Sequence, residues 1–230
     1  MVNQPDVYTY VMVPGTYPDA TYVTPVAGQT RIFITESTGE IRLVDPATVD
    51  AALYLTVSDL HADKANGEHG LLTIAPAPDF AASGILYVYA MNAAGGLEIR
   101  RYGRLNATTG DPASMQVVLN IPAKAPSAAA APELDGGWIG FGPDGHLYIM
   151  TSAGTPPANT SLAPPVSGDL TSLLGKVLRI AVSRDDFPAD SSRNYAIPAR
   201  NPFAASATSA NEVWAYGFIR PRRASLTATT

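Results

Sequence analysis

The 230-residue sequence contains no cysteine, which excludes disulfide bridges, a thiolate nucleophile and cysteine-based metal sites. Charged residues are also scarce, at 15% of the chain with a net charge of −5. Such a surface lacks the basic stripe that neutralises a phosphate backbone, so we expect no nucleic acid among the partners. The one local basic cluster, within residues 220–223, is expected to be a solvated loop.

Long apolar runs are missing as well. No segment approaches the roughly 18 apolar residues that a membrane span needs, so we expect no transmembrane segment. The residues after Met1 form neither the charged region nor the apolar region of a signal peptide. Either the chain is not exported, or a signal peptide has been removed from this sequence.

The histidines offer little for metal binding. His61, His69 and His146 lack both the spacing of a helical metal motif and a cysteine companion, so we expect no metal site. His69 follows Glu68, and this pair is expected to anchor a turn through a hydrogen bond rather than to act in catalysis.

What the sequence does contain is many short apolar runs separated by turn residues. Hydrophobic residues make up 46% of the chain, and 20 prolines and 19 glycines punctuate it. This pattern is typical of an all-β protein, and the length suits one domain over residues 1–230. Strands are expected near residues 7–13, 21–26, 31–36, 39–44, 51–57, 70–75, 84–91, 96–104, 115–120, 137–142, 145–151, 176–183, 212–218 and 223–228. Irregular connections are expected at 123–132, 155–168 and 185–209.

The most informative stretch is GEHGLLTIAPAPDF at residues 67–80, followed at 84–90 by GILYVYA. A glycine-bounded turn, an apolar run, a Pro-Asp turn and a second β-rich run are typical of successive strands in one propeller blade. We expect two adjacent strands here. The residues expected to be buried are Leu71, Leu72, Ile74, Phe80, Leu86 and Val88.

This stretch resembles the glucose/sorbosone dehydrogenase family, the soluble quinoproteins that oxidise sugars with pyrroloquinoline quinone (PQQ). Four more blocks are similar to the family in the same order. They are FITESTGEIR at 33–42, GGWIGFGPDGHLYI at 136–149, LLGKVLRI at 173–180, and IPARNPF with VWAYG over 197–217. The resemblance implies a six-bladed β-propeller and, because the family is typically periplasmic or secreted, an extracytoplasmic location.

The strand count implies that this propeller is incomplete. About fourteen strands at four per blade make about three and a half to four blades. Sheets arranged radially leave exposed edges unless the ring closes, so we expect the strands near 7–13 and 223–228 to end at open edges. The expected partner is another polypeptide that covers them.

The resemblance also locates the family's catalytic base. A histidine precedes the paired glycines of the central hairpin in the family, and here that position falls on Leu134. Leucine cannot accept a proton. Glu133 or Asp135 could replace the base after a shift of one residue, although either could equally be a turn or cap residue.

At further positions, too, this sequence lacks the residues that the resemblance implies for an active enzyme. The Arg and Asn of the family's Arg-Asn-Pro run, which contact the cofactor, fall on Ile219 and Arg220. A glutamine common in the active enzymes falls on Glu68. Calcium needs six to eight oxygen ligands, and no acidic cluster with such spacing is present.

Two functions therefore remain open at this point. The first is a degenerate, non-catalytic sugar-dehydrogenase-like propeller that binds no cofactor and acts as a structural or interaction subunit of a larger extracytoplasmic assembly. The alternative is an active PQQ-dependent aldose dehydrogenase, with PQQ and calcium bound, in which Glu133 or Asp135 is the base while hydride passes to the quinone.

Overall fold

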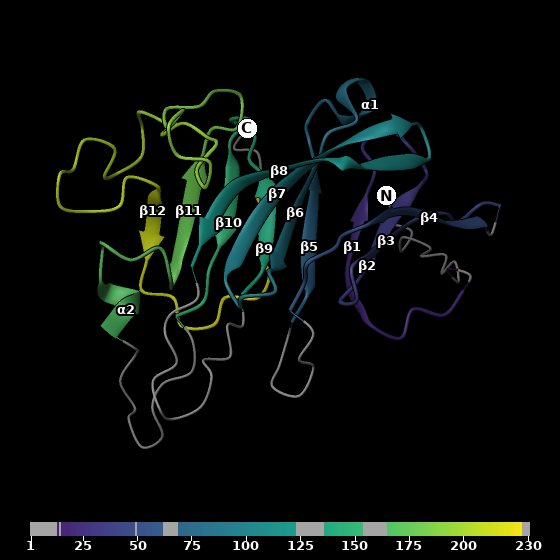
Figure 1. Cartoon of the computed structure of the whole chain (residues 1–230), viewed down its shortest axis with the longest axis horizontal. Coiled ribbons are helices and arrows are strands. Elements are labelled where there is room, and N and C mark those ends of the chain that lie inside the picture. Colours follow the sequence, from purple (N-terminus) through teal and green to yellow (C-terminus); the bar gives the residue numbers. More distant parts are fainter. Residues whose placement is uncertain are drawn as a thin grey trace, which may run out of the picture.

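The fold was analysed in a computed structural model, which describes residues 13, 15–48, 50–61, 69–122, 136–153 and 165–226. These residues form three antiparallel sheets of four strands each, with two helices of four residues. In every sheet the strands are neighbours in chain order. Figure 1 shows the three sheets side by side.

Each sheet is one contiguous stretch of chain. The first contains β1 (Ala20–Pro25), β2 (Ile32–Glu36), β3 (Glu40–Asp45) and β4 (Asp50–Thr56). The second contains β5 (Leu71–Pro76), β6 (Leu86–Met91), β7 (Leu97–Asn106) and β8 (Thr109–Ile121), with α1 (Phe80–Ser83) between β5 and β6. The third contains β9 (Trp138–Phe141), β10 (Leu147–Met150), β11 (Lys176–Ile180) and β12 (Val213–Tyr216), with α2 (Pro165–Gly168) before β11.

The first strands of the three sheets lie together. Strand β5 contacts both β1 and β9, and β4 lies against β8. The sheets therefore share an inner edge formed by β1, β5 and β9, as blades of a propeller do. This arrangement confirms the expected fold class.

The middle sheet is buried on both faces, which explains the continuous apolar sequence of β6. Leu86 and Val88 pack into the core shared with the first sheet. Tyr87 and Tyr89 pack into the core shared with the third sheet. Alternate residues of a strand point to opposite faces, so the apolar sequence of β6 fits its place between two other sheets.

The expectation for the second sheet is confirmed over the described part of 67–90. Two adjacent strands form there, and each of the residues expected to be buried is at most 4% exposed, namely Leu71, Leu72, Ile74, Phe80, Leu86 and Val88. Gly70 allows the close approach that starts this hairpin. It has φ +77°, and a β-carbon on it would lie 2.0 Å from the Ser37 carbonyl oxygen.

The strand expected near 223–228 is wrong over its described residues, because 223–226 have no regular structure. Arg223 donates a 2.7 Å hydrogen bond to the Thr21 carbonyl oxygen, and Ala224 packs against a cluster containing Trp138. These contacts replace strand pairing. The strand expected near 7–13 lies outside the described residues except for residue 13, so the described chain contains three blades.

The remaining expectations concern connections. The stretch 185–209 contains turns and bends without a strand, as expected. Residues 123–132 lie outside the described residues, and so does 155–164. No strand pair links the first sheet to the third among the residues that the structure describes.

Candidate functional site

The described candidate positions Ile219 and Arg220 lie at one end of the blades, the end at which β5 and β9 begin and β6, β10 and β12 finish. We call it the loop end (Figure 1). Ile219 and Arg220 follow β12 there. Glu68, Glu133, Leu134 and Asp135 lie outside the described residues, directly before the described His69 and Gly136.

The structure brings residues 136 and 219 to the same neighbour, Ser152. The Ser152 hydroxyl donates a 2.8 Å hydrogen bond to the Ile219 carbonyl oxygen, and the Ala153 amide donates one of 2.9 Å to the same atom. A β-carbon on Gly136 would lie 2.9 Å from the Ser152 nitrogen. Residues 136 and 219, 83 positions apart in sequence (219 minus 136), therefore lie close together.

The side chains at this point do not fit the quinone's requirements. Ile219, 38% exposed, has an aliphatic side chain that cannot form an ion pair with a carboxylate. Arg220 is exposed at the neighbouring position, and its reach differs from that of an arginine at 219. The cation that the family resemblance requires is thus absent at 219, and no reaction step through PQQ can be derived from the described residues.

Lys176 is also at the loop end, but its ammonium group has a structural role. The side chain is fully buried and Nζ donates to the carbonyl oxygens of Leu174 (2.7 Å), Val166 (2.8 Å) and Ser167 (3.2 Å). Burial lowers the pKa of Lys176, and the charge of Asp169 opposes that change. The contacts with Val166 and Ser167 hold α2 against the third sheet.

An aromatic contact connects the first and third sheets. The Trp138 indole Nε1 of β9 donates a 3.2 Å hydrogen bond to the phenol oxygen of Tyr22 in β1. Trp138 packs with Tyr148 and Met150, and Ala224 covers this cluster. No local sequence pattern predicts this contact, because its two residues are 116 positions apart.

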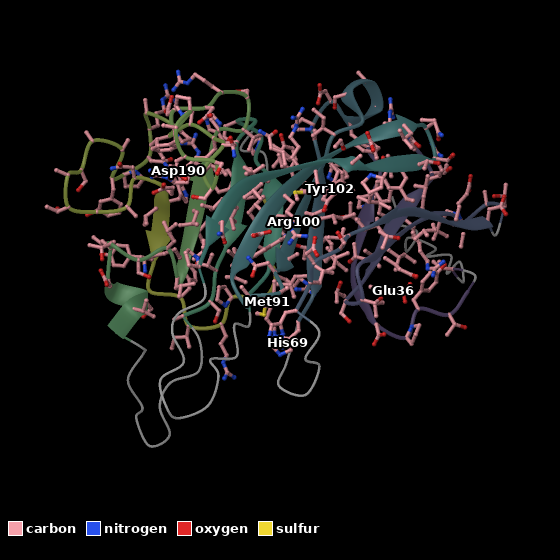
Figure 2. All side chains as sticks on the ribbon, in the orientation of Figure 1. Glu36, His69, Met91, Arg100, Tyr102 and Asp190 are labelled. Carbon is pink, nitrogen blue, oxygen red and sulfur yellow. The ribbon has the colours of Figure 1, made fainter. Side chains whose placement is uncertain are left out.

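His69 is placed against a residue that the sequence analysis did not consider. Its Nδ1 lies 3.4 Å from the Met91 sulfur at the end of β6 (Figure 2). The hairpin register could have revealed this pair, because Leu71 lies opposite Ala90. His146 lies at the opposite end of the blades, before β10. Its pKa is lowered by burial and by the charge of Arg179, against the influence of Asp144.

Neither end contains a conventional metal cluster in the part of the chain that the structure describes. Groups of three or more His, Cys, Asp or Glu side chains are absent there. The helices of this part are also too short to cross a membrane.

The outer faces of the first and third sheets are not covered by another sheet within the described residues. On the first sheet, Val23, Ile34, Arg42 and Leu53 form one cross-strand row. Val23 and Leu53 are about half exposed, at 53% and 49%. Arg42 in this row bonds Glu36 (2.8 Å) and also Glu40.

The third sheet has an aromatic outer face. Leu178 and Ile180 point toward the second sheet, so Arg179 points away from it. The Arg179 guanidinium pairs with Asp144 (2.6 Å) and lies 4.8 Å from the ring centre of Trp214. Trp214 and Tyr216 of β12 are exposed.

Three four-stranded blades around a shared inner edge define a protein of the β-propeller class. The family profile described as Glucose / Sorbosone dehydrogenase matches residues 20–230. The chain belongs to this family.

Solved structures agree with the fold. An oxidoreductase from Thermus thermophilus described as a glucose dehydrogenase is 26% identical, with a TM-score of 0.68, over 91% of this chain and 54% of that chain. The PQQ-bound aldose sugar dehydrogenase from Streptomyces coelicolor is 24% identical, with a TM-score of 0.63, over 90% of this chain and 53% of that one. The latter similarity supports the fold alone.

The curated relatives have different names. Hedgehog-interacting protein from Homo sapiens is 30% identical in an alignment of length 210 that covers 85% of this chain and 28% of the relative. The HIPL2 protein from Arabidopsis thaliana is 39% identical in an alignment of length 95 that covers 39% of this chain and 13% of the relative. The chain thus spans less than a third of the length of these relatives and about half of the solved chains.

Proposed function

We propose that this chain is a non-catalytic member of the family that serves as a structural or interaction module. The observation that supports this most directly is Ile219, whose carbonyl oxygen accepts a hydrogen bond from Ser152 and whose side chain is aliphatic where the family resemblance places a cofactor-binding arginine. Leu134, where the resemblance places the base, agrees with it.

The proposed partner is a polypeptide that covers the outer faces of the first and third sheets. Val23 and Leu53 on one face and Trp214 and Tyr216 on the other expose large apolar surface of a kind that inner propeller faces bury. One relative's name, Hedgehog-interacting protein, describes a protein that binds another protein.

We further propose an extracytoplasmic location in the periplasm or outside the cell, which rests on the family resemblance. The chain lacks cysteine, so folding there would not depend on disulfide formation. Fusing the gene with its native upstream sequence to a reporter that is active only after export would test this proposal. Reporter activity confined to the cytoplasm would contradict it.

The alternative function is a PQQ-dependent aldose dehydrogenase with Glu133 or Asp135 as the base. The 26% identity with the Thermus protein described as a glucose dehydrogenase favours it. When bound, PQQ would supply the hydride acceptor.

A dye-reduction assay separates the two functions. The purified chain is incubated with PQQ and calcium, and electron transfer from glucose and other aldoses to a dye is followed, with the Escherichia coli aldose sugar dehydrogenase as the active control. We expect no reduction above the protein-free rate. Reduction that Glu133→Gln or Asp135→Asn abolishes, while PQQ binding persists, would establish the enzyme instead.

Restoring the family residue gives a second measurement that does not need turnover. Ile219→Arg returns a cation to the site, and a guanidinium beside the quinone's carboxylates strengthens binding. We expect tighter PQQ binding in Ile219→Arg than in the wild type, followed by quinone absorbance. Ile219→Met is the control for side-chain size.

A further inference from the structure

Two imidazoles and a thioether meet at the loop end, beside the inner edge of the second sheet. His61 follows β4, His69 precedes β5 and Met91 ends β6. The Nδ1 atom of His69 is 3.4 Å from the Met91 sulfur, and the rings of His61 and His69 lie with centroids 5.2 Å apart. Figure 2 shows His69 and Met91 together at this end.

Backbone hydrogen bonds hold the three residues in place. The Met91 amide donates to the Gly70 carbonyl oxygen (2.8 Å), and the His61 amide donates to the Met91 carbonyl oxygen (3.1 Å). Met91 is 3% exposed, so its thioether is fixed within the core. A site whose supporting atoms are fixed before binding loses little conformational freedom when a ligand arrives.

The His69 ring lacks strong hydrogen-bond partners. Its Nε2 atom is buried and has no hydrogen-bond partner, and its Nδ1 atom faces only the Met91 sulfur, which is a weak acceptor. Nδ1 is therefore the ring nitrogen placed to share an ion with the Met91 sulfur, because a nitrogen inside the protein normally has a strong hydrogen-bond partner. The neutral imidazole is a common metal ligand in proteins.

The distances match those of ligands on one metal ion. Nitrogen and sulfur ligands lie about 2.0 and 2.3 Å from a tetrahedral metal, so the two donor atoms are about 3.5 Å apart. The observed Nδ1-to-sulfur distance is 3.4 Å. Two imidazoles on one such metal have ring centres about 5 Å apart, and the observed separation is 5.2 Å.

We propose that His61, His69 and Met91 form a binding site for copper(I). A thioether is a soft ligand that favours Cu(I) over zinc, calcium or magnesium, and imidazole suits copper as well. The spacing of the histidines alone predicted no metal site, because the third ligand is a methionine brought near by the β5–β6 hairpin. The site does not depend on whether the chain oxidises sugars.

The test is a competition titration with Cu(I) itself. The full 230-residue chain, stripped with a chelator and kept anaerobic with ascorbate, is titrated against bicinchoninate, which reports free Cu(I) by its colour. We expect one Cu(I) per chain, with at least tenfold weaker binding in His61→Gln, His69→Gln and Met91→Leu. His146→Gln and Met150→Leu are matched controls, at the far end of the blades and in another buried strand respectively.

Two results would overturn the proposal. One is wild-type affinity no higher than that of the three variants. The other is Zn(II) binding that is tighter than Cu(I) binding and unchanged in Met91→Leu. Should Met91→Leu fail to fold by circular dichroism, X-ray absorption of the wild-type Cu(I) complex replaces it. A sulfur ligand at about 2.3 Å supports the site, and a spectrum with only nitrogen or oxygen ligands refutes it.

Discussion

The indole of Trp138 donates its hydrogen bond to Tyr22, and this single bond joins the innermost strands of the first and third sheets. Trp138 is buried, at 6% exposure, so its donor depends on the tyrosine. Tyr22→Phe removes the acceptor while keeping the ring. We expect it to lower the free energy of unfolding by about 1 kcal/mol, measured by urea denaturation.

Tyr216→Phe is the control for that substitution, because Tyr216 is 54% exposed. It should leave the unfolding free energy unchanged. Equal effects of the two substitutions would mean that the Trp138 bond contributes nothing specific to the junction of the first and third sheets.

A buried ion pair within β7 of the second sheet also holds the segment that follows β4. Arg100 pairs with Glu98 (2.6 Å) and also donates to the carbonyl oxygens of Ser58 (2.6 Å) and Asp59 (3.2 Å). Arg100→Met leaves the Glu98 carboxylate and both carbonyls without this partner. We expect a loss of about 3–5 kcal/mol in unfolding free energy, measured by denaturant titration.

The comparison for Arg100 is Arg184→Met. Arg184 pairs with Asp186 at 3.0 Å, but its side chain is 70% exposed, so the expected loss is below about 1 kcal/mol. Similar losses in both variants would show that burial does not determine how much these ion pairs contribute to the unfolding free energy.

Gly70→Ala tests the close contact between the backbones of the first and second sheets at Gly70 and Ser37. The residue has φ +77°, and the added β-carbon would meet the Ser37 carbonyl oxygen at 2.0 Å. Because a backbone atom cannot rotate away, we expect a loss of about 2 kcal/mol or more in thermal or urea unfolding. Gly168→Ala is the control, since no atom lies within 4 Å of its added β-carbon; a neutral Gly70→Ala would refute the contact.

The pH dependence of stability should contain a contribution from His146. Its pKa in the folded chain is lowered below 6.5 by burial and by the charge of Arg179, so the folded state binds a proton less readily than the unfolded state. The stabilisation is therefore complete above pH 6.5 and is lost as the pH falls through the folded-state pKa.

We expect the wild type to lose stability relative to His146→Gln as the pH falls from about 7 to about 5. Urea unfolding at several pH values measures the difference, and NMR titration of the imidazole gives the folded-state pKa. A midpoint above 6.5 would contradict the assigned environment.

The strands were predictable because their apolar runs are local signals. Leu86 and Val88 alternate with tyrosines that are equally apolar in their packing, and this pattern indicated a strand buried on both faces. At 223–226 the sequence misled, because Ala224 packs against the distant Trp138 and Arg223 reaches Thr21. No local pattern records such tertiary contacts.

The candidate site was predictable only as a set of positions. The family resemblance placed Ile219 at the loop end, where the structure has it beside Ser152. It gave no indication that His69 meets Met91, because 22 residues separate them. A site formed by residues on two paired strands can be predicted only when the pairing register of the strands is known in addition to the residue types.

The three sheets occupy the successive segments 20–56, 71–121 and 138–216, and each strand pairs only with its neighbours in the chain. Every sheet can therefore be completed from residues already synthesised, before the next sheet leaves the ribosome. The second sheet would emerge with one apolar face already matched by the first sheet and the other face waiting for β9. Translation order and assembly order coincide in this chain, so a pause in synthesis after residue 121 would leave the Tyr87 and Tyr89 face exposed to chaperones.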